Sequence, residues 1–231
     1  MKLKFERFEP CIELNPKWVS TLEVEDGGLF SGMVEALVSE RGESSAEPYV
    51  IFSDEGRSIA ARGKLLVLNS LPCLPLTDQS MKKSLYLKMA AEISEHPENE
   101  GMAEDLADLA AKMCQAFAGA SLNLWGDYQF EIDWDIVAFL KAFGYSPRAY
   151  EGEGLLEKCI NFLSLCVDIG YSKPLVFVNL KKFLSERDAK SFVEQSIFHG
   201  ISVLLLESGC SEFEIPGERK TSIDHRFLVS Y

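Results

Sequence analysis

The sequence predicts an α/β protein in which a helical insertion divides a core with a parallel sheet. Two continuous apolar runs, 174–179 and 201–206, flank an amphipathic segment. A buried strand, a helix and a second buried strand in that order form a parallel βαβ unit. The stretch 71–150 is rich in helical patterns and interrupts this arrangement. We therefore expect a core domain from residues 1–70 and 151–231, with the stretch between them as a helical insertion domain.

The first 70 residues predict strands and one helix. Residues 18–25 alternate and are rich in β-forming side chains, and residues 29–38 have apolar side chains at helical spacing. Residues 49–52 form a short apolar strand, and the turn signal at 54–56 predicts a hairpin. The continuous apolar run at 64–69 predicts a strand that is buried on both faces.

The insertion predicts three helices. The first is expected to be capped by Thr77 or Ser80, and the others are expected at 102–117 and 134–143. A short strand is expected between the last two helices, at 128–132, where polar and apolar residues alternate.

The last third returns to the α/β pattern. A broad apolar face predicts a helix at 154–168, ahead of the βαβ unit. Within that unit, Ser185 is expected to cap the helix, with Asp188 at its third position. A final short strand is expected at 226–229.

Composition and charge limit the classes of function. Apolar residues make up 47% of the 231 residues and charged residues 26%, which is typical of a globular protein. The net charge is −13, which argues against a protein that coats nucleic acid with its outer surface. No apolar run is long enough for a membrane span, and the first residues do not resemble a signal peptide. We expect a cytoplasmic protein with no membrane partner.

A parallel sheet suggests nucleotide binding, but the required residues are missing. Gly27 and Gly32 have the glycine spacing of a phosphate-binding loop, yet Met33 and Val34 stand where the motif needs Lys and Ser or Thr. The strand at 175–178 ends in Asn179, where Asp would hold Mg²⁺. No Gly-x-Ser-x-Gly motif accompanies the three histidines. We therefore expect no nucleotide cofactor and no catalytic residues.

One acidic segment is a candidate metal site. Residues 113–140 contain no Lys or Arg but contain Asp127, Glu131, Asp133 and Asp135. In an extended segment the last three carboxylates share one face, where a hard cation such as Ca²⁺ would relieve their repulsion. The alternative is a solvated loop in which Asp133 caps the next helix and Asp135 lies in its first turn.

The basic residues fall into groups, and several in one concavity would form a positive lining within an acidic protein. The alternative for each group is a solvated surface that keeps the protein soluble. The candidate DNA contacts are Lys17, Arg57, Arg62, Lys64, Lys82, Lys83 and Lys88.

Taken in order, these segments resemble the Csn-two family, the adaptation proteins of type II-A CRISPR loci. The resemblance extends over nearly the whole chain and lies in the order and spacing of its segments. The stretches that carry it are 22–26, 29–31, 157–160, 175–179, 183–185, 203–207 and 223–229.

The resemblance implies a fold like that of P-loop ATPases but without the loop lysine. It also implies a homotetrameric ring that binds the ends of double-stranded DNA, supported by calcium, and that has no catalytic activity of its own. Such rings act in spacer acquisition, with the spacer integrase and the RNA-guided effector nuclease of the same locus as partners. Two alternatives remain open, namely an interaction scaffold that does not touch DNA and a nucleotide-dependent enzyme with an unusual phosphate site.

The resemblance transfers to individual residues unevenly. It favours Lys17, Arg57, Lys82 and Lys83 as DNA contacts. For calcium it favours Glu131, Asp133 and Asp135, which lie in the segment that corresponds to the family's acidic region.

Overall fold

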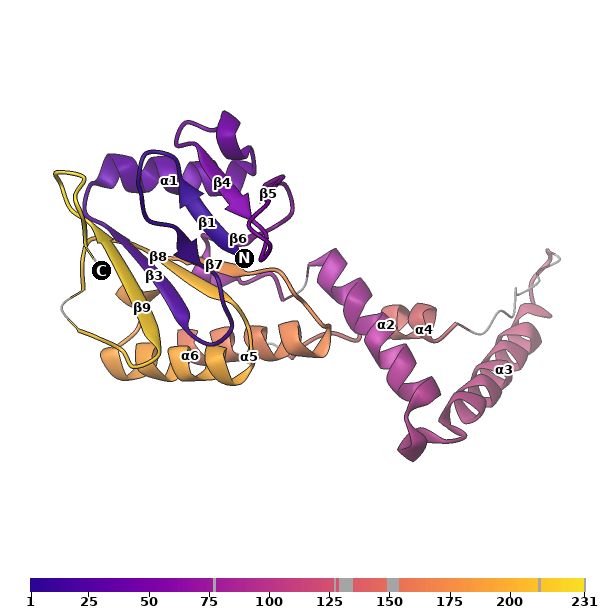
Figure 1. The fold of residues 1–231 in the computed structure, drawn as a ribbon. Coiled ribbons are helices and arrows are strands. Elements are labelled where there is room, and N and C mark those ends of the chain that lie inside the picture. The colour runs from indigo at the N-terminus through magenta and orange to yellow at the C-terminus, as the bar shows by residue number, and fades with distance from the viewer. Residues whose placement is uncertain (77, 127, 129–134, 149–153, 212, 231) are drawn as a thin grey trace. The chain divides into compact units, whose positions relative to one another are not determined.

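The computed structural model describes residues 1–76, 78–126, 128, 135–148, 154–211 and 213–230 (Figure 1). The chain divides into two compact units. The α/β unit consists of Met1–Leu74 and Ala149–Tyr231, and the helical unit consists of Pro75–Arg148.

The α/β unit is built around a six-stranded sheet with the order β10-β9-β3-β8-β7-β6. All neighbouring pairs are parallel except β9 and β10. The sheet is therefore the parallel one that the apolar runs predict, and the α/β class is confirmed. The strands are β3 (Val19–Val24), β6 (Leu66–Leu68), β7 (Leu175–Val178), β8 (Val203–Ser208), β9 (Glu218–Ile223) and β10 (Val229–Ser230).

Helices cover both faces of this sheet (Figure 1). Helix α1 (Gly27–Ser39) lies along one face, and α5 (Leu155–Asp168) and α6 (Glu186–Phe198) lie along the other. On the second face the Phe177 and Phe192 rings meet edge to face, with their centroids 5.0 Å apart.

A smaller antiparallel sheet extends the core beside α1. Its order is β2-β1-β4-β5, and its inward side chains, such as Leu3 and Ile51, pack in one cluster with Met33 and Leu37. The strands are β1 (Lys2–Phe5), β2 (Ile12–Glu13), β4 (Tyr49–Phe52) and β5 (Ser58–Ile59). The predicted hairpin joins β4 to β5.

Two predictions for the strands of the main sheet were wrong in detail. Strand β6 was expected to be buried on both faces, but it is an edge strand that pairs only with β7, and Leu66 and Val67 are half-buried. The last strand begins only at Val229, because Asp224 accepts hydrogen bonds from the backbone N–H groups of Arg226 and Leu228 and holds a turn there.

The helix ends follow the expected capping chemistry. The Ser185 hydroxyl accepts a hydrogen bond from the Asp188 N–H at 3.1 Å, as predicted. Helix α2 is capped by Asp78 and not by Ser80, because the Asp78 carboxylate accepts from the Ser80 N–H at 2.8 Å. Thr77, the other expected cap, lies outside the described residues.

The helical unit contains α2 (Gln79–Glu95), α3 (Met102–Ser121) and α4 (Ile136–Ala142). Apart from Tyr128, the strand expected at 128–132 lies outside the described residues. In the parts of the chain that are described, no helix has both the length and the apolar character of a membrane span. Short 3₁₀ turns complete the chain: η1 (Gly42–Ser44), η2 (Leu71–Cys73), η3 (Pro97–Asn99) and η4 (Leu180–Phe183).

Candidate functional site

The connection from β3 to α1 stands where a phosphate-binding loop would lie. The Asp26 carboxylate already accepts a hydrogen bond from the Leu29 N–H at 2.7 Å, and Glu25 accepts one from the His225 N–H at 3.1 Å. Two carboxylates at the N-terminus of a helix lie where a phosphate would bind, and their negative charge repels a phosphate. Met33 is fully buried in the core, so the motif's lysine position points away from any such ligand.

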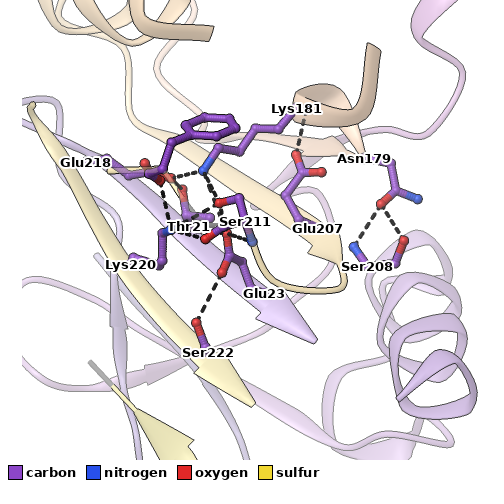
Figure 2. A network of polar contacts seen from close by, with 11 residues as sticks. Thr21, Glu23, Asn179, Lys181, Glu207, Ser208, Ser211, Glu218, Lys220 and Ser222 are labelled. Atoms are coloured by element: carbon purple, nitrogen blue, oxygen red, sulfur yellow. Dashed lines mark hydrogen bonds and ion pairs between the residues drawn. The ribbon is translucent and has the colours of Figure 1, made fainter. Parts of the chain in front are cut away.

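Charged side chains are buried on the opposite face of β3, next to β9 (Figure 2). Side chains alternate along a strand, so Leu22 and Val24 join α1 in the core while Thr21 and Glu23 point to the other face. We define the buried charge cluster as Glu23, Lys181, Glu207, Glu218 and, at its half-buried margin, Lys220.

Short ion pairs connect the cluster. Lys181 Nζ lies 2.7 Å from Glu218 Oε1 and 3.7 Å from Glu23 Oε1, and Lys220 Nζ lies 3.5 Å from Glu23 Oε1. The side chains of Lys181, Glu218 and Glu23 are only 5%, 2% and 1% exposed. Both lysines also donate to the Ser211 hydroxyl, at 3.2 and 3.0 Å. Carboxylates therefore neutralise the positive charge of both lysines, inside the protein for Lys181 and at a half-buried position for Lys220.

Glu207 adds a carboxyl group with an altered proton affinity. Burial raises the pKa of Glu207 to about 7, although the Lys181 N–H donates to its Oε1 at 2.9 Å and favours the charged form. The nearby cavity has a volume of about 130 Å³. Small-molecule pockets usually measure roughly 300–1,000 Å³, so the cluster has the character of a closed internal network.

Asn179 stands where a nucleotide-binding protein would have an Asp that holds Mg²⁺, and its side chain makes hydrogen bonds within the protein. Its backbone adopts the left-handed conformation with φ 57°, and its Oδ1 accepts hydrogen bonds from the N–H and the hydroxyl of Ser208, both at 2.8 Å. The side chain thus ties the end of β7 to the end of β8.

The predicted DNA contacts are distributed over both units. In the α/β unit, Lys17, Arg62 and Lys64 are exposed. Arg57 is also exposed, on the hairpin between β4 and β5, and its Nε lies 3.5 Å from Glu55 Oε2.

The other three predicted DNA contacts lie on α2 of the helical unit. Lys83 and Lys88 are exposed and Lys82 is half-buried. Lys88 Nζ lies 2.7 Å from Glu92 Oε1, which leaves Lys82 and Lys83 as the stronger candidates on this helix.

Most of the predicted calcium ligands cannot be placed. Asp127, Glu131 and Asp133 lie outside the described residues. Asp135 is the N-cap of α4, where it accepts a hydrogen bond from the Val137 N–H at 2.9 Å, although it was expected in the first turn. Within the ranges that are described, no three His, Cys, Asp or Glu side chains are grouped to hold a metal ion. Calcium binding stays a prediction.

Sequence reasoning missed the buried charge cluster. Its clearest signal is the pair Thr21 and Glu23, two polar residues at alternate positions of a strand that is buried throughout, which marks a face that needs polar partners. The partners, Lys181 and Glu218, are far away in the sequence, and no local pattern identifies them.

Comparison with known proteins gives consistent results. Residues 43–225 match the family described as "CRISPR-associated protein (Cas_Csn2)". The chain is 22% identical over 232 residues to "CRISPR-associated protein Csn2" of Enterococcus faecalis, covering 100% of this chain and 99% of that protein. Its fold is similar to that in "Crystal structure of Stu0660 of Streptococcus thermophilus", with a TM-score of 0.54, 16% identity, and coverage of 92% of this chain and 70% of that one. Because the family match extends over most of its length, this chain belongs to the CRISPR-associated Csn2 family.

Proposed function

We propose that the protein is a non-catalytic, homotetrameric ring that binds the ends of double-stranded DNA during CRISPR spacer acquisition in the cytoplasm. Its partners would be the spacer integrase and the RNA-guided effector nuclease of the same locus. The observation that carries the proposal is the Csn2 family match over residues 43–225. The proposal assigns DNA contact to lysines and arginines of both units, and the exposed ones are Lys17, Arg57, Arg62, Lys64, Lys83 and Lys88.

The charge distribution supports binding through a limited surface. The net charge is −13, yet Lys17, Lys64 and Lys83 lie in no ion pair with another described residue. A ring needs positive charge only on the surface that faces the DNA, because a concave surface lined with basic side chains focuses the electrostatic potential there. The remaining acidic surface can face water.

The helical unit supports self-association. Its α2, α3 and α4 surround an apolar cavity of about 350 Å³, lined in part by Leu109, Met113 and Phe143. Phe143 is 72% exposed and Leu109 is 55% exposed. Exposed apolar patches of this kind mark protein interfaces, and a second copy of the chain is the occupant that a homotetramer supplies.

The proposal treats the main sheet as a P-loop-NTPase-like core that no longer binds nucleotide. The capping contact of Asp26 and the burial of Met33 support this view, because together they remove the space and the charge that a nucleotide phosphate needs. Calcium would be held by the acidic segment that contains Asp127, Glu131, Asp133 and Asp135.

The proposal is tested with linear and covalently closed DNA of the same sequence, with calcium or a chelator, and with native mass measured alongside. We expect the linear form to bind and the closed form not to, because a ring threads onto ends. Chelation is expected to weaken the ring or its binding. Affinity should fall with salt with a slope of about −0.9 per phosphate neutralised. Equal binding of both forms would contradict the ring, and absence of binding to either would favour an interaction scaffold.

A further inference from the structure

The carboxyl ends of the strands, where parallel α/β sheets usually bind ligands, are an unfavourable place for DNA in this protein. Glu25 and Asp26 follow β3, and Glu207 lies at the end of β8. The nearby Lys181 is used in ion pairs within the buried charge cluster. A phosphate approaching this edge would meet these carboxylates, and the exposed Lys182 beside them already donates to the Ser208 hydroxyl.

The amino ends of the strands carry the opposite charge. Lys17 stands two residues before β3, Lys64 two residues before β6, and Lys173 two residues before β7. All three lysines are exposed. Because these strands are parallel, the amino end of each one lies at the same edge of the sheet.

The strand register places the three lysines in one row. Leu66 is opposite Leu175 and Leu175 is opposite Val203, so Lys64 and Lys173 are neighbours in register. Lys17 precedes β3, which is the next strand beyond β8. With neighbouring strands about 4.8 Å apart, the row crosses three spacings and measures about 14 Å. This length is comparable to the roughly 12 Å width of the DNA major groove.

The positions of the ammonium groups agree with this row. A β carbon placed on Gly63 would lie 3.9 Å from Lys173 Nζ, so the Lys173 ammonium reaches the residue next to Lys64. Among the described residues, no carboxylate forms an ion pair with Lys17, Lys64 or Lys173. No described carboxylate therefore neutralises their charge, unlike that of Lys181, although Lys173 Nζ lies 6.0 Å from the centroid of the Tyr171 ring.

We propose that Lys17, Lys64 and Lys173, at the amino ends of β3, β6 and β7, form the surface of the α/β unit that contacts duplex DNA phosphates. We name this row the amino-edge lysines. The inference rests on the proposed DNA binding and adds a location and one new residue, Lys173. Flexible lysines act as point charges, so they suit contact with the phosphate backbone without sequence preference.

The test compares two triple variants of the full-length chain. The first carries Lys17→Gln, Lys64→Gln and Lys173→Gln. The matched control carries Lys182→Gln, Arg187→Gln and Lys190→Gln, which remove the same charge from exposed positions after β7 and on α6. Affinity for a linear duplex is measured between 50 and 200 mM salt, and thermal unfolding confirms that both variants fold.

We expect the negative slope of log K against log salt to become shallower by about 2.7 in the first variant, which is 0.9 per lysine for one contacting subunit. Across this fourfold salt range, wild-type affinity should fall about 40-fold more than that of the variant. The control should keep the wild-type slope.

Two results overturn the inference while DNA binding stands: a wild-type slope in the first variant, or an equal loss in the control. A wild-type protein that binds no duplex would overturn the proposed function, and the inference would fall with it.

Discussion

Lysines at two places in the α/β unit have opposite surroundings. Lys181 and Lys220 lie in the buried charge cluster, within 4 Å of Glu23 carboxylate oxygens. The amino-edge lysines are exposed and form no ion pair with a described residue. The net charge of −13 describes the whole chain, so it does not distinguish the two groups of lysines or indicate where positive charge is available. Local pairing decides which lysines hold the fold together and which remain free to bind.

The largest expected effect is a loss of stability when a lysine of the buried charge cluster is replaced. Lys181→Met should lower the free energy of unfolding by about 3–5 kcal/mol, because it leaves buried carboxylates without their cation. Urea unfolding measures this change. Lys190→Met is the control: Lys190 is exposed on α6, and its loss should cost no more than about 0.5 kcal/mol. Equal effects of the two substitutions would contradict the structural role of Lys181.

A second prediction concerns pH. The pKa of Glu207 is about 7 in the folded protein, above its ordinary value of 4.5, so the folded state binds more protons between these values. The stability that Glu207 contributes is therefore fully present below pH 4.5 and is lost as pH rises through 7. The total change is about 3 kcal/mol.

Glu207→Gln isolates this contribution, because glutamine accepts the hydrogen bond from the Lys181 N–H without ionising. Relative to wild type, the variant should gain about 3 kcal/mol in unfolding free energy between pH 4.5 and pH 8. Denaturant unfolding at several pH values measures the difference. Parallel pH curves for the two proteins would show that Glu207 titrates normally.

The sequence predicted the parts of the fold that depend on local apolar patterns. Strands β7 and β8 and helices α1, α5 and α6 all follow from continuous apolar runs or helical spacing. Strand β9 was missed because its residues, Glu-Arg-Lys-Thr-Ser-Ile, are mostly polar. These residues enter the sheet because their polar side chains meet Thr21 and Glu23 on the neighbouring strand.

The site was less predictable, because its geometry depends on register between distant segments. Lys17 and Lys64 were recognised as basic candidates, but Lys173 was not, since a single lysine before a strand has no local signature. Only the parallel pairing of β6 with β7 makes Lys173 a neighbour of Lys64. The cluster shows the same limit, because the Thr21 hydroxyl donates to a carboxylate 197 residues away.

The most direct test of the comparison is lysine acylation of the wild-type protein, read by mass spectrometry with and without saturating linear duplex. We predict that bound DNA protects Lys17, Lys64 and Lys173, while the exposed Lys182 and Lys190 keep their reactivity. Lys181 should react slowly in both samples, because its side chain is only 5% exposed. Unchanged reactivity of the amino-edge lysines, or protection of Lys182 and Lys190 in their place, would contradict the account.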